Sequence, residues 1–513
     1  MPADASDLRR SVYLLLTAAA VGIAVAKVVG AENVFEPSRY TPPAAGGYSA
    51  VPPDPPRNWP AARPDPSPMF GSNDKSRWAT VRALVENKTY SIGKRVYPDG
   101  ADPKTFRDEG IVADPQFKSL DIVLRPLGEN AKGPQTREFF SSKPPLFATL
   151  LAGEYWLLHR AFGWEIVRDR WLVVPTILVT VNVLPFLVYL VLLARLIDGA
   201  GRTDYGRLLA FATACFGTFL TTFSGTLNNH LPAAFCALFA AYPVLRAVAE
   251  NRDMAPRGYL CCGFFAASAA TFDLPAAAFL AAVGLPLLVA RPGPTLLFFL
   301  PGALVPLVAL VACNHAALGS PLPAYSEFGG PWYNFEGSHW AKRGTPQAKG
   351  IDFNDEPMSI YAFHLLLGHH GWFSLTPVFV VALAGLIGLG VRSAADVRKM
   401  ARGAGKGPAW TPRLFAAMTL AVSAVVFVFY LTRTQSYNYG GFTSGPRWLF
   451  WLIPLWLVAV PVAADRLAGS RAGRVAGAVL LGASVMSVFY PAWNPWRAPW
   501  LLQLLEFTGK VRY

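Results

Sequence analysis

Long apolar runs are the feature that most constrains this chain. Several of them approach or exceed the roughly 20 residues that an α-helix needs to cross a bilayer. Charged residues make up 15% of the chain, whereas a soluble domain has about 25%. The sequence therefore predicts an all-α polytopic membrane protein.

The formal net charge of +14 does not indicate a nucleic-acid-binding protein. The basic residues gather in short loops between apolar runs, which is typical of cytoplasmic loops in membrane proteins. No compact basic domain is present that could follow a phosphate backbone. The five cysteines lie in apolar segments, so the sequence predicts neither a disulfide framework nor a cysteine-bound zinc ion.

The segment 143–163 decides how many spans the sequence predicts. If it crossed the membrane, every later loop would change sides and the most basic loop, 391–413, would lie outside. We therefore expect 143–163 to be an amphipathic helix on the outer interface. About eleven spans follow, with a range of about 10 to 13. They are 11–30, 171–196, 206–224, 231–249, 258–271, 274–290, 295–317, 372–391, 412–432, 447–465 and 473–490.

The same charge distribution predicts a cytoplasmic N-terminus and an outer C-terminus in the cell inner membrane. Residues 1–30 are expected to form a retained signal anchor. Arg9 and Arg10 before an apolar run also fit a cleaved signal peptide, and this alternative stays open.

The outer segments are expected to carry the function. Residues 31–170 form a long first outer loop, in which 37–68 is Pro-rich and helices at about 75–88 and 144–162 lie on the interface. The remaining divisions are core helices 171–317, a second outer loop 318–371, C-terminal spans 372–490 and a short outer tail 491–513.

The polar stretch Asn73–Ile92 follows the first span and contains a short amphipathic helix. Apolar residues recur at three- and four-residue spacing from Trp78 to Val85. Asn73 or Asp74 fits the N-cap position, so Asp74 has a purely structural interpretation. The alternative is that its carboxylate lies at the outer membrane face and acts as a base.

Three short motifs on the same expected side of the membrane resemble a known family. In content and order they resemble the GT-C class of integral-membrane glycosyltransferases, which includes the protein O-mannosyltransferases and the aminoarabinose transferase of lipid A. The resemblance covers the N-terminal half. The motifs are Asn73-Asp74-Lys75-Ser76-Arg77, Ser142-Lys143-Pro144-Pro145-Leu146 and Ser224-Gly225-Thr226-Leu227-Asn228-Asn229-His230.

The third motif departs from the family pattern. Many relatives have an acidic residue or pair in that loop, whereas this chain has Asn228, Asn229 and His230. This difference weakens a metal-binding role for the loop.

The resemblance implies transfer of a hexosyl or pentosyl unit, with inversion, from a polyprenyl-phosphate carrier to an acceptor at the outer surface. Such a reaction needs a carboxylate to take a proton from the acceptor hydroxyl and cations around the phosphate leaving group. Asp74 is the expected base, with Asp121 as its reserve and a candidate for sugar binding. Lys143 and Arg137 are the expected phosphate ligands, and an interfacial lysine is the alternative for Lys143.

Two further outer stretches contribute candidate residues. His369 and His370 lie in a Gly-flanked loop, from which both could reach the donor phosphate. They could equally be plain interfacial histidines. A third metal ligand is not evident in the sequence, so no ligand is assigned and a divalent metal stays open. Arg447 is expected at the carrier phosphate, and an arginine that starts a span beside an aromatic belt is the alternative. Acceptor or sugar contacts are expected from Asn228, Asn229, His230, Tyr437 and Tyr439.

A transporter or flippase of lipid-linked saccharides is the alternative function. Such a protein should carry ionisable residues in mid-span and broken helices in paired positions, whereas here the polar residues collect on the expected outer side. A non-catalytic scaffold is a third hypothesis. The identities of the sugar and the acceptor stay open.

Overall fold

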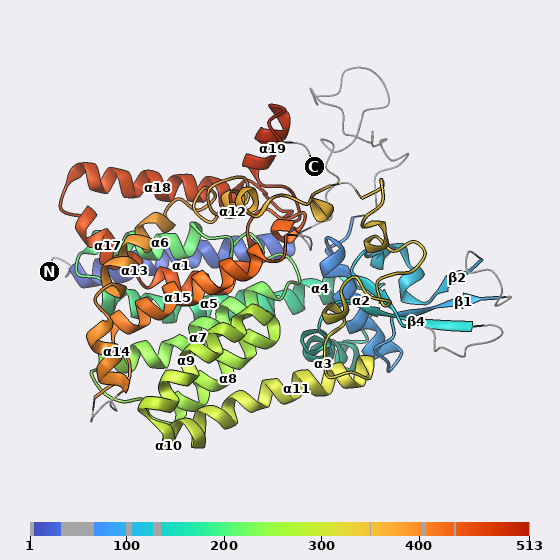
Figure 1. Ribbon diagram of the computed structural model, residues 1–513, viewed down its shortest axis with the longest axis horizontal. Coiled ribbons are helices and arrows are strands. Elements are labelled where there is room, and N and C mark those ends of the chain that lie inside the picture. The colour runs from blue at the N-terminus through green and yellow to red at the C-terminus, as the bar shows by residue number, and fades with distance from the viewer. Residues whose placement is uncertain are drawn as a thin grey trace.

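The computed structural model describes residues 5–31, 66–98, 105–126, 135–348, 350–401, 407–434, 438–511 and 513. Most of the Pro-rich segment and the candidate Tyr437 lie outside these residues. The described chain forms a bundle of long helices with a smaller mixed α/β part at one end (Figure 1).

The long helices of the bundle run roughly along the longest axis of the molecule (Figure 1). Six helices of the described chain are long and apolar enough to cross a membrane. They are α1 (Ala5–Val29), α4 (Arg170–Leu178) continued by α5 (Leu184–Ala200), α7 (His230–Ala249), α10 (Pro292–Pro294) continued by α11 (Leu300–Leu318), α15 (Pro412–Leu431) and α18 (Arg471–Phe489).

A seventh candidate span is bent by 61° between Arg447–Leu457 and Val460–Leu467. The bundle therefore supports a multi-pass membrane protein, whereas the expected count of about eleven spans stays a prediction. Its other helices are α6 (Asp204–Phe216), α8 (Pro256–Phe272), α9 (Ala277–Ala290), α13 (Phe379–Gly390), α14 (Ala394–Ala401), α16 (Ile453–Leu457) and α17 (Val460–Leu467).

Apolar side chains remain exposed along the outer faces of the bundle. In the most apolar windows of the α10–α11 span and of α18, only 22% of the residues are buried. Leu304, Val305 and Val308 of α11 are all exposed. An apolar surface of this kind is expected where helices contact lipid rather than water.

The mixed part contains a small antiparallel sheet that the sequence analysis did not predict. The strand order is β2-β1-β4-β3. The prediction of an all-α protein therefore holds for the bundle and is wrong for this part. The strands are β1 (Gly93–Tyr97), β2 (Arg107–Glu109), β3 (Ile122–Leu124) and β4 (Gln135–Ser141).

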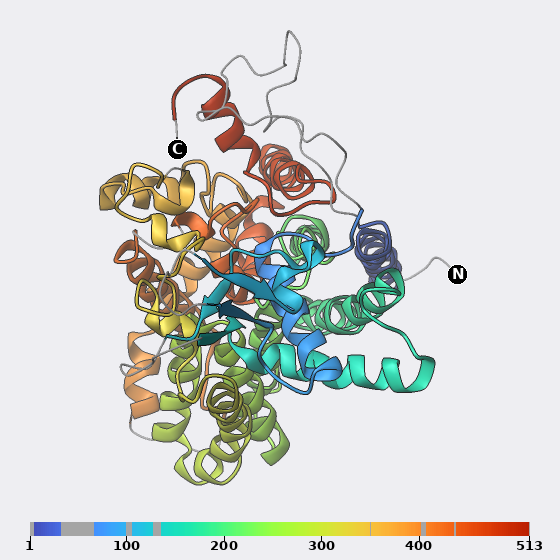
Figure 2. The same ribbon diagram turned by 90° about the vertical axis from the view of Figure 1, so that its right-hand side faces the viewer.

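Two helices connect the sheet to the bundle. α2 (Ser72–Glu86) packs against α3 (Pro145–Phe162). Pro145 opens α3 at the position where its missing N–H costs nothing, and Gly163, with φ 69°, ends it. Figure 2 shows α3 lying across the end of the bundle rather than along it, which is the arrangement expected of an interfacial helix.

The loop 318–371 packs against the sheet. The buried side chains of Val123 and Phe140 contact those of Tyr333 and Trp340. The Leu124 N–H donates to the Trp332 carbonyl at 3.0 Å. Two loops that are far apart in the sequence thus form one folded unit above the bundle end. The remaining helices of this end are α12 (Met358–Leu366) and α19 (Trp500–Phe507).

Candidate functional site

Charged and polar side chains gather where the mixed part meets the bundle. We call this group the charge cluster. It combines three cations with three carboxylates and two polar side chains, nearly all of them buried. Burying charged groups is costly unless each one is paired. A cluster of this many buried charged groups therefore requires an explanation. The members are Asp74, Arg77, Asp121, Lys143, Asn229, His230, Asp273 and Arg447.

Asp74 lies in the first turn of α2 and is fully buried. It is not the N-cap: the N-cap residue is Gly71, which makes no side-chain cap. The Phe70 N–H donates to Oδ2 of Asp74 at 3.0 Å. Oδ1 is buried and has no hydrogen bond of good geometry among the described residues, although the Leu227 N–H and the Trp78 indole lie close enough to the carboxylate to lower its pKa. Burial raises the pKa of Asp74 to about 7, although the Phe70 N–H and the Arg77 charge oppose that shift.

Arg77 lies one turn further along α2, three residues after Asp74. Its guanidinium donates from Nη2 to the Asn229 side-chain oxygen at 2.6 Å and from Nη1 to the Asn73 carbonyl at 3.0 Å. Burial lowers the pKa of Arg77 to about 10, against the attraction of Asp121. The sequence analysis quoted Arg77 in a motif but gave it no role. Its i,i+3 spacing from Asp74, which places both on one helix face, is the signal that could have found it.

A chain of hydrogen bonds joins Arg447, His230 and Asp273. Nη1 of Arg447 lies 2.8 Å from Nε2 of His230, and Nδ1 of His230 lies 2.8 Å from Oδ2 of Asp273. Because a guanidinium can only donate, Nε2 of His230 accepts. Nδ1 then carries the proton and donates to Asp273. Burial raises the pKa of Asp273 well above its usual value, against the Arg447 and Arg77 charges.

A strained turn holds Arg447 in this position. Nε and Nη2 of Arg447 both donate to the Gly440 carbonyl, at 3.1 and 2.8 Å. The preceding residue, Tyr439, is buried with φ 56°, a left-handed conformation that costs energy for any residue with a side chain. The strain indicates that the surrounding contacts dictate this turn.

The side chains of Asn228 and Asn229 form hydrogen bonds to nearby backbone groups and to Arg77. The Asn228 side-chain oxygen accepts the N–H groups of His230 and Leu231, at 3.1 and 3.0 Å, and so stabilises the start of α7. Asn229 donates to the Phe272 carbonyl at 2.7 Å and accepts from Arg77. Contact of these residues with a sugar stays a prediction.

Lys143 and Asp121 form the third part of the charge cluster. Nζ of Lys143 lies 2.7 Å from Oδ1 of Asp121, and both side chains are largely buried. Burial lowers the pKa of Lys143, although the Asp121 charge opposes the shift. The Asp121 carboxylate is thus already paired with a cation. Asp121 is therefore a weaker candidate for the base than Asp74.

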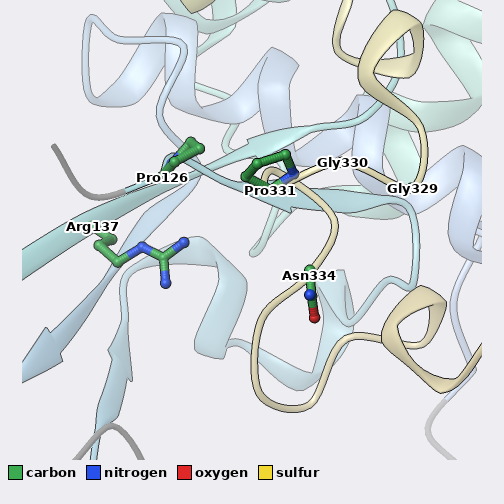
Figure 3. A pocket seen from close by; sticks show the side chains of 6 residues that line it. All are labelled: Pro126, Arg137, Gly329, Gly330, Pro331 and Asn334. Atoms are coloured by element: carbon green, nitrogen blue, oxygen red, sulfur yellow. The ribbon is translucent and has the colours of Figure 1, made fainter. Parts of the chain in front are cut away.

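Arg137, an expected phosphate ligand, lies elsewhere. Its Nε donates to the Arg125 carbonyl at 2.8 Å, and its side chain extends over a shallow pocket of about 390 Å³ lined also by Pro126, Pro331 and Asn334 (Figure 3). Arg137 is in the middle of β4, and an extended chain carries Lys143 about 15–20 Å further on. The structure therefore does not bring Arg137 to the charge cluster.

His369, His370 and Tyr439 form a separate buried group. The two Nδ1 atoms of the histidines lie 2.6 Å apart, and the ring of Tyr439 stacks on that of His370 with centroids 5.2 Å apart. Burial lowers the pKa of His369 and lowers that of His370 to about 3. Both imidazoles are therefore neutral at pH 7, which makes them weaker phosphate ligands than the sequence analysis expected.

The charge cluster is suited to an anion. Arg77, Lys143 and Arg447 present cations from three separate chain segments, and guanidinium groups match phosphate geometry. Of the carboxylates, Asp121 and Asp273 already bond to cluster members, which leaves Asp74 with the open oxygen. A base beside an anion site is what a transfer reaction from a phosphate leaving group needs.

No family pattern matches the sequence, and no curated protein matches it significantly. The chain is similar to two crystal structures of the Archaeoglobus fulgidus oligosaccharyltransferase, one in the apo form and one tethered to an acceptor peptide with the NVT sequon. Both share 12% identity with it, with TM-scores of 0.40 and 0.38. The matches cover 94% of this chain but only 55% and 54% of theirs, so the chain spans about half their length.

The similarity to these two structures is weak. Their TM-scores lie below 0.5, so the function proposed below rests on the charge cluster and not on them.

Proposed function

We propose that this protein is a membrane glycosyltransferase that moves a sugar from a polyprenyl-phosphate-linked donor to an acceptor hydroxyl. The observation that carries the proposal is the charge cluster. It holds a carboxylate with a pKa of about 7 and one oxygen without a hydrogen bond among the described residues, near the Arg77 guanidinium. Two further cations, Lys143 and Arg447, belong to the same cluster and act on Arg77 or on each other. A buried carboxylate oxygen without a hydrogen bond lowers the stability of the fold. A purely structural role as an ion pair therefore does not account for it.

The proposed reaction uses the cluster residues in distinct roles. The Asp74 carboxylate takes the proton of the acceptor hydroxyl. The acceptor oxygen then forms a bond to the anomeric carbon, while the bond from that carbon to the phosphate oxygen breaks. Arg77, Lys143 and Arg447 stabilise the charge that develops on the departing phosphate. Attack from the face opposite the phosphate inverts the anomeric configuration.

The location of the cluster fits a lipid-linked donor. A polyprenyl chain cannot leave the bilayer, so its phosphate reaches the protein at the membrane surface. The charge cluster lies at the end of the bundle, beside α3, which crosses that end with Leu150, Leu157 and Phe162 exposed. We propose that this end faces the outside of the inner membrane and that the N-terminus is cytoplasmic.

Transfer of radiolabelled sugar from a polyprenyl-phosphate donor pool tests the proposal. Membranes with wild-type protein are compared with Asp74→Asn and Asp114→Asn at matched expression. Asp114 is a matched control, because it is also in the mixed part and pairs with Arg82 at 3.2 Å, outside the charge cluster.

We expect Asp74→Asn to lower transfer by about 10²–10⁴-fold, the usual contribution of a general base, and Asp114→Asn to keep it. Equal transfer by wild type and Asp74→Asn would remove Asp74 from the mechanism. If wild type moves no carrier-linked sugar, the proposal fails and a transporter of lipid-linked saccharides becomes the better hypothesis.

A further inference from the structure

A second group of side chains, two half-buried and one buried, contains ligands of the kind that bind transition metals. Glu356 precedes α12, His364 is on that helix, and His369 is in the turn that follows it. One potential ligand atom of each lies within 4.8 Å of the other two. None of the three belongs to the charge cluster, and the proposed transfer does not use them.

We propose that Glu356, His364 and His369 bind a divalent transition metal ion, with Zn²⁺ as the best match, and that the ion holds the turn that positions Arg447. Two imidazoles and one carboxylate with an open fourth position are a ligand set typical of zinc. Zinc–ligand distances of about 2.0–2.1 Å place tetrahedral ligands about 3.4 Å apart. The three ligand atoms, now within 4.8 Å of one another, therefore need to approach by up to about 1.4 Å.

The position of His364 leaves one of its ring nitrogens buried without a hydrogen bond, and a bound metal ion would offset that energetic cost. Nδ1 of His364 is buried and has no hydrogen-bond partner in the described part of the chain. Its ring stacks on that of His369 with centroids 3.9 Å apart. A Cβ at Gly368 would lie 2.2 Å from this same nitrogen, so only glycine lets His364 fold against the turn.

The groups around His369 fit the surroundings of a metal-bound histidine. A metal-bound imidazole usually donates its second N–H to an acceptor that fixes its orientation. Nδ1 of His370, 2.6 Å from Nδ1 of His369, is placed to accept it, which leaves Nε2 for the ion. The Tyr513 hydroxyl lies 2.5 Å from that Nε2 and 2.9 Å from Oε1 of Glu356. A single atom can therefore contact both ligands.

The site connects to the charge cluster through Tyr439. The Tyr439 hydroxyl donates to Glu356, and its ring packs against those of His369 and His370. The next residue, Gly440, accepts both hydrogen bonds from Arg447. An ion bound to Glu356 and His369 would thus stabilise the left-handed turn that orients the Arg447 guanidinium.

The test measures metal content and does not depend on glycosyl transfer. Full-length protein in detergent is stripped with a chelator and loaded with Zn²⁺. After removal of excess metal, bound zinc is measured by inductively coupled plasma mass spectrometry. Five proteins are compared: wild type, His364→Ala, a Glu356→Gln/His364→Ala double variant, His370→Ala, and His315→Ala as the control. His315 is exposed on α11 and distant from the three ligands in the sequence.

We expect about one zinc per chain in wild type and His315→Ala, and loss of that zinc in His364→Ala and the double variant. His370→Ala should weaken zinc affinity by about 10–100-fold, as expected for a residue that orients a ligand. Wild type without zinc, or equal zinc in wild type and the double variant, would overturn the proposal.

Cobalt spectroscopy on wild type alone covers the case in which the variants do not fold. Loading with Co²⁺ should produce visible d–d absorption bands that Zn²⁺ abolishes. Their absence would also overturn the proposal.

Discussion

The two ends of the bundle both collect charged side chains, but their surroundings differ. At the end with α14 and the start of α1 (Figure 1), Arg9 pairs with Asp198 at 3.2 Å and with Asp204 at 2.5 Å. The Asp198 and Asp204 side chains are 35% and 48% exposed. We call these residues, with Arg207, the basic-end network. It joins α1, α5 and α6 at a wet surface, where each pair contributes only about 0–1 kcal/mol.

The charge cluster at the opposite end contains the same residue types, but its side chains are mostly buried from solvent. Asp74 is fully buried and keeps one unpaired oxygen, whereas the basic-end carboxylates have cation partners and solvent. The difference indicates what each group does. Exposed, paired charges stabilise a helix junction, whereas buried, incompletely paired charges are poised for a ligand.

Among the variants that compare the two ends, removing Arg447 should give the largest effect. We expect Arg447→Gln to lower sugar transfer by about 10²–10³-fold, because one donor to the developing phosphate charge is lost. Arg207→Gln in the basic-end network is the matched change and should leave transfer within about twofold. Radiolabel transfer in membranes measures both. Equal losses in the two variants would mean that the ends do not differ in function.

The stability of Asp74→Asn sharpens the comparison through its pH dependence. Folding raises the pKa of Asp74 from 3.8 to about 7. The folded protein therefore holds a proton that the unfolded chain releases, and stability is lost as the pH rises between these two values. Above pH 7 the loss reaches about 4 kcal/mol, and asparagine avoids it. Asp74→Asn should thus raise the melting temperature more at pH 8 than at pH 5. An identical shift at both pH values would show that the buried carboxylate stays ionised throughout.

The smallest effect is expected in the basic-end network. Asp204→Asn should lower the free energy of unfolding by no more than about 1 kcal/mol, because the pair with Arg9 is exposed and screened by salt. The difference from wild type should shrink further at high salt. Thermal unfolding at low and high ionic strength measures this. A loss of several kcal/mol would contradict the view that solvent exposure keeps the contribution of these ion pairs to stability small.

Sequence patterns predicted the parts of the structure that long-range hydrophobicity determines. Apolar runs located the long helices, and the prolines and glycine that bound α3 are visible in the sequence. The sequence analysis did not predict the sheet, because strands as short and charged as Arg107–Glu109 have no alternating apolar pattern. The sheet also packs against a loop about 200 residues away, and no local pattern encodes that contact.

The candidate site was only partly predictable for the same reason. Asp74, Lys143 and Arg447 stand in motifs that point to the reaction, and the fold brings them into one cluster. Arg137 was a candidate because it is close to Lys143 in the sequence. The extended strand β4 separates the two residues in space. Glu356 and His364 were missed as metal ligands because neither is adjacent to the His369–His370 pair. Only the turn at Gly368 folds His364 back onto His369.

The pH dependence of sugar transfer by wild type tests the central claim most directly, that Asp74 in the charge cluster is the base. With a saturating polyprenyl-phosphate donor and membranes held between pH 5 and 8, the logarithm of the rate should rise with a slope of about one. It should level off near pH 7, where the Asp74 carboxyl becomes ionised. The residual rate of Asp74→Asn should lack this rise. A flat profile for wild type, or the same rise in Asp74→Asn, would contradict the account.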